Sequence, residues 1–185
     1  MKKNGPAGRC RTCGVQLVDW TRVHRGNLED VNYTFECMRY EMIRHYFWHI
    51  PLPLYAVNYA RRKGRSDLRE AARKQIARAV ASPNHPRQGQ QTPRETNPHA
   101  NAIHYAQHAT ASCCRKCLEE WYGIPMDRDL TEQELSYLTD LAMLYVVARI
   151  PDLTEGPVQV PHLRAAAEAA PVAKENQLRV PRHAA

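Results

Sequence analysis

The stretch Tyr105-Ala-Gln-His-Ala-Thr-Ala-Ser-Cys-Cys-Arg-Lys-Cys117 holds three of the six cysteines of this 185-residue chain. Cys114 and Cys117 form a C-x2-C pair, and Cys10 and Cys13 form a second pair near the start of the chain. Each such pair can place two thiolates at two corners of a tetrahedron from one tight turn. The sequence therefore predicts a structural Zn²⁺ site made by Cys10, Cys13, Cys114 and Cys117.

Other ligand sets stay open at the same place. Cys113 competes with Cys114, because adjacent residues on one helix point about 100° apart and are not expected to bind one ion together. His108 and His24 are alternative imidazole ligands. A mixed His/Cys set would leave a coordination position free for water, as in catalytic zinc sites, whereas four cysteines would close the site.

A basic region follows in the middle of the chain, and the whole chain carries a formal net charge of +7. Positive charge gathered on neighbouring helices is typical of proteins that contact phosphates without reading sequence. The sequence therefore predicts nucleic acid, DNA or RNA, as the partner. The residues predicted to contact it are Arg61, Arg62, Lys63, Arg65, Arg69 and Arg73.

Composition sets the class of protein. Hydrophobic residues make up 43% of the chain and charged residues 24%, which fits one globular domain with a core. No apolar run approaches the roughly 20 residues that span a bilayer, so no membrane association is expected. We expect a cytoplasmic protein, and in that reducing compartment C-x2-C pairs favour metal over disulfides.

Apolar spacing predicts a predominantly α-helical α+β fold with a zinc knuckle, or ribbon-like element, and a small β element. Ser66 is a candidate N-cap, and Thr131 with Glu134 forms a capping box. An apolar stripe of Val31, Phe35, Met38, Met42 and Tyr46 suggests one long helix. The expected helices cover 29–49, 55–63, a segment from 66, 114–122 and a segment from 131, with extended segments at 16–23 and 102–106.

The predicted domain organisation is simple. A flexible basic lead covers 1–9, and a single zinc-stabilised domain covers 10–153. Within that domain, residues 82–101 form a long proline-rich loop, and loops of such length are typically functional or disordered. Residues 154–185, which contain several prolines and an alanine-rich stretch, are predicted to be a disordered or weakly ordered tail.

The segment from His104 to Pro125 resembles a bacterial and phage family that is catalogued only as a domain of unknown function. The shared pattern is AQHATA-x-CCR-x-C-L-x-x-W-x-G-I-P, preceded by a Gln-Thr-Pro like residues 91–93. Residues 10–14, 19–20 and 43–49 resemble longer members. Tyr122 departs from the pattern, because histidine is typical there. The resemblance implies no activity, substrate or partner.

These patterns lead to one leading hypothesis and two alternatives. The leading hypothesis is a zinc-stabilised, basic, nucleic-acid-associated binding module without catalysis of its own. The first alternative is a metal-dependent hydrolase or nuclease with His104, His108 and either Glu41 or His45 around an open zinc. The second is an adaptor subunit of a larger phage or bacterial complex.

Overall fold

The structure is a computed structural model that describes residues 8–10, 12–83 and 92–163. In this part of the chain it contains eight α-helices and one short 3-10 helix. The predominantly helical prediction is therefore confirmed. Among the described residues, β structure is limited to one antiparallel bridge between Arg9 and Gln16, so a larger β element is not confirmed. None of the helices found there is both long and apolar enough to cross a bilayer.

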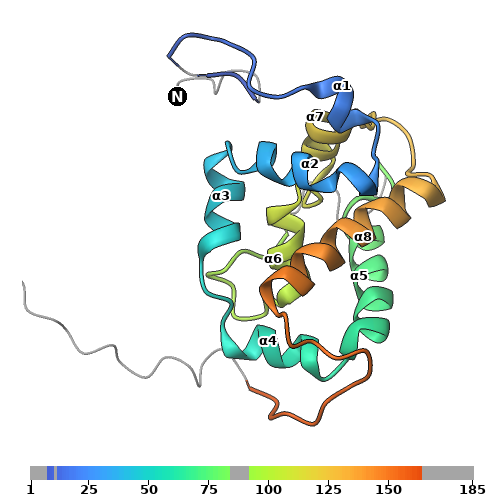
Figure 1. The fold of residues 1–185 in the computed structure, drawn as a ribbon. Helices are drawn as coiled ribbons and strands as arrows, with labels where there is room; N and C mark the ends of the chain where they lie inside the picture. Colours follow the sequence, from blue (N-terminus) through green and yellow to red (C-terminus); the bar gives the residue numbers. More distant parts are fainter. Residues whose placement is uncertain (1–7, 11, 84–91, 164–185) are drawn as a thin grey trace, which may run out of the picture.

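Helix α6 (Ala102–Ala109) lies at the centre of the molecule, with α3 (Met42–His49) on one side and α5 (Gly64–Val80) and α8 (Glu132–Arg149) on the other (Figure 1). Every residue of α6 except His104 is buried. Alanines at three of its eight positions let neighbouring helices approach closely. A helix that is covered on nearly all sides thus leads directly into the cysteine segment.

Helices α5 and α8 form the broadest helix pair and match the sequence prediction well. The stripe on α5 is fully buried. The predicted capping box is present at the start of α8, where Thr131 and Glu134 bond to each other's backbone amides. The buried residues of the two helices are Leu68, Ala72, Ile76 and Val80 on α5 and Leu135, Leu138, Leu141, Ala142, Tyr145 and Val146 on α8.

The single helix predicted over 29–49 is wrong, because the chain divides there. The 3-10 helix η1 (Leu28–Asp30) leads into α2 (Val31–Met38), and α3 begins after residues 39–41. Phe35 is buried on α2, and Arg44 is buried on α3. In one straight helix these two side chains would point about 180° apart, so the break lets both face the core.

The predicted apolar stripe fails for the same reason. Met42 is 75% exposed and Tyr46 is 41% exposed, although both belong to that stripe. Phe47, which lies outside it, is fully buried. The apolar face of α3 therefore differs from the continuation of the α2 face.

Residues 102–106 were predicted as a strand and instead begin α6. The Asn101 side chain accepts hydrogen bonds from the backbone amides of Ile103 and His104, and the His104 ring accepts one from the Asn101 amide, 3.0 Å away. This is a capping box in which histidine takes the place of the usual Glu or Gln. Because histidine is not the usual residue at this position, the sequence pattern does not indicate that a helix begins here.

The other element boundaries shift by smaller amounts. Part of the predicted extended segment 16–23 is α1 (Trp20–His24), which begins where the Asp19 side chain accepts from the Arg22 amide. Helix α4 spans Leu54–Arg61, close to the prediction. Helix α5 begins at Gly64 rather than after Ser66. Gly64 has φ +67°, and a Cβ there would collide with the backbone of Gly156.

Residues 154–163, the described beginning of the predicted tail, lie along α4 and the start of α5. The Arg65 amide donates to the Thr154 carbonyl at 2.9 Å, and the Val158 amide donates to the Arg61 carbonyl at 2.8 Å. This part of the chain is therefore held by backbone hydrogen bonds. Residues 164–185 of the tail, 1–7 of the lead and 84–91 of the long loop lie outside the described residues.

Candidate metal centre

Cys113, Cys114 and Cys117 bring their sulfur atoms together at the start of α7 (Arg115–Tyr122). The Cys117 sulfur lies 3.4 Å from that of Cys114 and 3.6 Å from that of Cys113. Among the described residues, this is the group of three or more possible metal ligands whose atoms all lie within 4.8 Å of one another. A cluster of three cysteines that can hold a metal ion is therefore present.

The helical rotation that was expected to separate Cys113 from Cys114 does not occur. Cys114 is the N-cap of α7 and has an extended backbone, with φ −161° and ψ 163°. Both residues therefore precede the helix, and the 100° rotation between helical neighbours does not separate them. The bend at Cys113, the extended Cys114 and the first turn of α7 together place the three thiols around one point.

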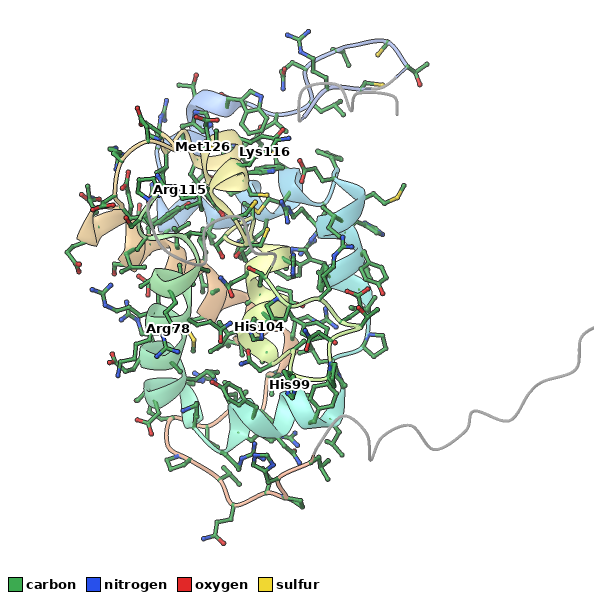
Figure 2. The ribbon with its side chains drawn as sticks, turned by 180° about the vertical axis from the view of Figure 1, so that it is seen from behind. Arg78, His99, His104, Arg115, Lys116 and Met126 are labelled. Carbon is green, nitrogen blue, oxygen red and sulfur yellow. The ribbon has the colours of Figure 1, made fainter. Side chains whose placement is uncertain are left out.

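The two intervening residues of the C-x2-C pair hold this turn in place in different ways. Figure 2 labels them, Arg115 and Lys116, at the start of α7. Arg115 is 2% exposed, and its guanidinium donates to the Val80 carbonyl at 2.9 Å and to the carbonyls of Pro125 and Arg128. It thereby ties the start of α7 to the end of α5 and to the loop after α7. Lys116 is exposed.

Arg44 reaches the cysteine cluster from α3. It is 3% exposed, and its guanidinium donates to the Cys117 sulfur at 2.9 Å and to the Cys113 sulfur at 3.7 Å. It also donates to the His108 carbonyl at 2.6 Å and lies 3.2 Å from the Glu41 carboxylate. A buried positive charge therefore faces the sulfur atoms and is partly balanced by Glu41.

The pKa values of the three thiols depend on one another. Hydrogen bonding with the Cys113 and Cys117 thiols lowers the pKa of Cys114. Hydrogen bonding with the neighbouring thiols, with burial, raises the pKa of Cys117. Ionisation of one thiol therefore opposes ionisation of its neighbours, and ionisation of all three needs further positive charge. A bound divalent cation supplies such charge, because metals bind cysteine as the thiolate.

The long loop supports the cluster from another side. The Thr92 hydroxyl donates to the Cys113 carbonyl at 2.7 Å. The His108 ring lies 3.0 Å from the Thr92 carbonyl through Nε2 and stacks on Phe47 at 4.6 Å. Burial lowers the pKa of His108, so the ring is favoured in its neutral form. His108 thus fixes the loop, and it is not among the three clustered ligands.

Cys10 and Cys13 lie in the N-terminal loop, which projects from the helical body beyond α1 and α7 (Figure 1). Backbone hydrogen bonds close the turn, and Gly14 has φ +74°. Cys13 is exposed and Cys10 half-buried. Neither belongs to the three-cysteine group, so the four-cysteine set stays a prediction.

The remaining histidines have other contacts. His24 lies against Trp20, with ring centroids 5.5 Å apart, and near Gly123 at the end of α7. His45 and His49 stack on each other at 4.0 Å, while the nearby Glu41 pairs with Arg44 instead. His104 caps α6. The hydrolase hypothesis requires histidines and a carboxylate to meet around one metal ion. Among the described residues, these side chains form no such group.

All six predicted phosphate-binding residues contact the protein itself. Three arginines pair with carboxylates of α8 or the segment just after it: Arg61 with Asp152, Arg69 with Asp140 and Arg73 with Glu132. Arg62 and Arg65 donate to backbone carbonyls at 2.9 and 2.8 Å, and Lys63 lies over the Tyr59 ring. These contacts weaken the basis for nucleic-acid binding, which stays a prediction.

Two residues of the centre were not identified from the sequence, namely Arg44 and Thr92. Both lie in segments that carry the family resemblance, residues 43–49 and 91–93. A stronger signal for Arg44 is its position three residues before Phe47. This spacing places the charged side chain and the apolar one on the same helix face. Tyr122, the departure from the family pattern, is buried, and its hydroxyl donates to the Thr110 carbonyl.

Comparison with known proteins places the centre within a family. No solved structure matches this chain. A protein family described as a domain of unknown function, DUF4186, matches residues 32–147. The match runs from α2 to α8 and includes Arg44, Thr92 and the three clustered cysteines, whereas Cys10 and Cys13 precede it. Because this match covers more than half of its length, the chain belongs to the DUF4186 family of domains of unknown function.

Proposed function

We propose that this domain binds one Zn²⁺ ion through Cys113, Cys114 and Cys117 and that the metal has a structural role. The observation that carries the proposal is the spacing of the sulfur atoms, 3.4 and 3.6 Å from Cys117. A tetrahedral zinc site with Zn–S bonds of about 2.3 Å requires S···S separations of about 3.8 Å. Small side-chain adjustments would therefore suffice.

Charge supports the same proposal. Three thiolates carry three negative charges, and Zn²⁺ with the Arg44 guanidinium carries three positive ones. Arg44 donates to two of the sulfur atoms, which is the outer contact that thiolate–metal sites favour. The metal would join the start of α7 to α3 and to the end of α6. In this way zinc would fix the fold, and the domain would act by binding a partner.

The fourth ligand is proposed to come from the N-terminal pair, Cys10 or Cys13. Their loop continues into α1, which packs on α7 through Trp20 and Trp121, with ring centroids 5.2 Å apart. The seven residues from Cys13 to Trp20 span at most about 25 Å when extended, which limits how far the pair can lie from α1. A fourth thiolate would close the site to water.

The test is zinc content together with X-ray absorption at the zinc edge on three proteins. Wild-type protein is expected to hold one zinc with a sulfur-dominated shell, and Cys117→Ser to lose it. Cys37→Ser, which changes a buried cysteine outside the cluster, is the matched control and is expected to keep the metal. Zinc retained by Cys117→Ser, or absent from wild-type protein, would overturn the proposal.

Cys13→Ser and Cys10→Ser separate the closed site from an open one. Loss of one sulfur from the shell in either variant supports a fourth ligand from the N-terminal loop. An unchanged shell of three sulfurs and one oxygen or nitrogen in both would show that the fourth position is open. That result would revive the hydrolase hypothesis.

A further inference from the structure

A groove lies at the C-terminal end of α3, where the chain turns into α4 and meets the long loop before α6. Its volume is about 610 Å³. Three tyrosines line it, Tyr46 from α3, Tyr55 from α4 and Tyr105 from α6, together with Glu95 from the loop. Three prolines complete the walls: Pro51, Pro53 and Pro98. Figure 2 labels His99, which follows this last proline on the loop that precedes α6, in the space between α6 and α4.

Glu95 is the charged residue among those that line the groove. Its Oε1 accepts a hydrogen bond from the Tyr46 hydroxyl at 3.3 Å. Its Oε2 is buried, and no described residue donates a hydrogen bond to it. A covered carboxylate oxygen without a donor is unfavourable, and a rotation of the Glu95 side chain that turns it into the groove would let a positively charged donor satisfy it.

The tyrosines give the groove a wall of aromatic rings. Tyr105 is 2% exposed and is backed by Phe47, with ring centroids 5.7 Å apart. Its pKa is raised by burial first and then by the charge and hydrogen bonding of Tyr55, which lines the same groove. Aromatic rings attract cations through their faces, and the attraction is strongest where water is excluded.

We propose that this groove binds a guanidinium group, such as the side chain of arginine. A guanidinium is planar, weakly hydrated and stacks on aromatic rings, and it carries N–H donors for a carboxylate oxygen. A quaternary ammonium satisfies the rings but has no N–H for Glu95. A primary ammonium has three N–H donors and is strongly hydrated, so rings and prolines accommodate it poorly.

Arg94 is the neighbouring positive charge that acts against such binding. It is exposed, next to Glu95 in sequence, and its charge opposes that of Glu95 in its effect on the Tyr46 hydroxyl. Removal of this charge is therefore expected to tighten the binding of a cation. The groove is separate from the cysteine cluster, so the proposal is independent of zinc.

The test is a nuclear magnetic resonance titration of the full chain with small probes. N-acetyl-arginine methylamide is expected to shift signals of the three tyrosines in a saturable way, whereas its uncharged isostere, N-acetyl-citrulline methylamide, is not. Free L-arginine is the second arm. Tighter binding of the blocked amide indicates an arginine within a peptide, and tighter binding of the free amino acid indicates a small metabolite. Both results support a guanidinium site.

Variants assign the binding to the groove. Glu95→Gln is expected to weaken it about tenfold or more, because a charged hydrogen bond is lost. Glu119→Gln, which changes an exposed carboxylate on α7, is the matched control and is expected to have no effect. Tyr55→Leu provides a second loss of affinity without a change in charge, and Arg94→Gln is expected to increase affinity.

Three outcomes would overturn the proposal. One is the absence of saturable binding by either arginine probe. Another is equal binding of the citrulline and arginine amides. The third concerns one more probe, N-acetyl-trimethyl-lysine methylamide: if it binds more tightly than the arginine amide, the groove is assigned to quaternary ammonium groups instead. Retained affinity in Glu95→Gln, with an unchanged thermal melting curve, would exclude the carboxylate.

Discussion

The two C-x2-C pairs have the same spacing but very different surroundings. Cys114 and Cys117 lie at the start of a packed helix, beside a third cysteine and beneath a buried arginine. Cys10 and Cys13 lie in a loop that projects from the helical body, and Cys13 is exposed. The family match includes the first of these pairs and excludes the second. The same C-x2-C spacing therefore occurs in two different structural environments.

The difference shows what the tertiary structure adds to a ligand pattern. Around Cys117, helices α3 and α7 and the long loop supply a cation, backbone anchors and burial. Each of these fixes thiol geometry before any metal binds, and a preformed site needs less ordering on binding. In the N-terminal loop, the cysteine pair is held by backbone hydrogen bonds within its own turn. Three predictions test how far this contrast extends, in order of expected effect.

The largest effect is expected from Arg44→Met, which keeps much of the apolar volume and removes every guanidinium contact. It leaves Glu41 half-buried without its partner and the His108 carbonyl without its donor. The free energy of unfolding should fall by about 3 kcal/mol, as when one partner of a buried pair is removed. Urea unfolding of metal-free protein measures this.

The matched control is Arg25→Met, because Arg25 is exposed at the end of α1. A surface change of this kind should alter stability by less than about 0.5 kcal/mol. Similar losses for the two variants would mean that the cysteine cluster has no special support from α3. The contrast between the two pairs would then fail.

The next effect concerns the pH dependence of α6, the helix that leads into the cluster. Burial lowers the pKa of His104 to about 4, whereas its unfolded value is near 6.5. The neutral ring is therefore favoured in the folded state, and its contribution is complete above pH 6.5 and decreases as the pH falls towards 4. By pH 5 the loss should reach about 2 kcal/mol.

His104→Gln tests this, because glutamine at the same position preserves the capping box and does not titrate. Urea unfolding at pH 7 and pH 5 should show a smaller decrease in stability for the variant than for the wild type. His99→Gln, which changes an exposed histidine, should retain the wild-type decrease. An unchanged pH dependence in His104→Gln would show that another group is responsible.

The smallest effect compares two glycines with positive φ, one following each cysteine pair in the sequence. Gly123 ends α7 with φ +64°, and a Cβ there would lie 3.4 Å from the His24 ring. Gly14 has φ +74°, and a Cβ there would meet nothing within 4 Å. In metal-free protein, Gly123→Ala should lose about 1 kcal/mol of global stability and Gly14→Ala less than about 0.5 kcal/mol.

Added zinc makes this pair of variants more informative. If the N-terminal loop supplies the fourth ligand, the loss caused by Gly14→Ala should increase when the metal is bound, because the loop then unfolds together with the core. A loss for Gly14→Ala that already equals that of Gly123→Ala without metal would contradict the view that the loop opens separately.

The sequence alone determined several elements whose signals are local. The apolar stripe of α5, the capping box at Thr131 and the end of α7 at Gly123 all depend on neighbours within a few residues. The C-x2-C pair at Cys114 likewise indicated metal chemistry. Such features follow from helix periodicity and capping, which act over one or two turns.

Other features required the tertiary structure. The break between α2 and α3 depends on where Phe35 and Arg44 must point, and that direction is set by helices distant in sequence. Cys113 joins the cluster because both it and the extended Cys114 precede α7, and Arg44 contacts it from 69 residues away. Ion pairs with α8 engage the arginines of α5 for a similar reason. Residue types fix which chemistry is possible, but long-range packing decides which groups meet, because contact between distant segments carries no local signature.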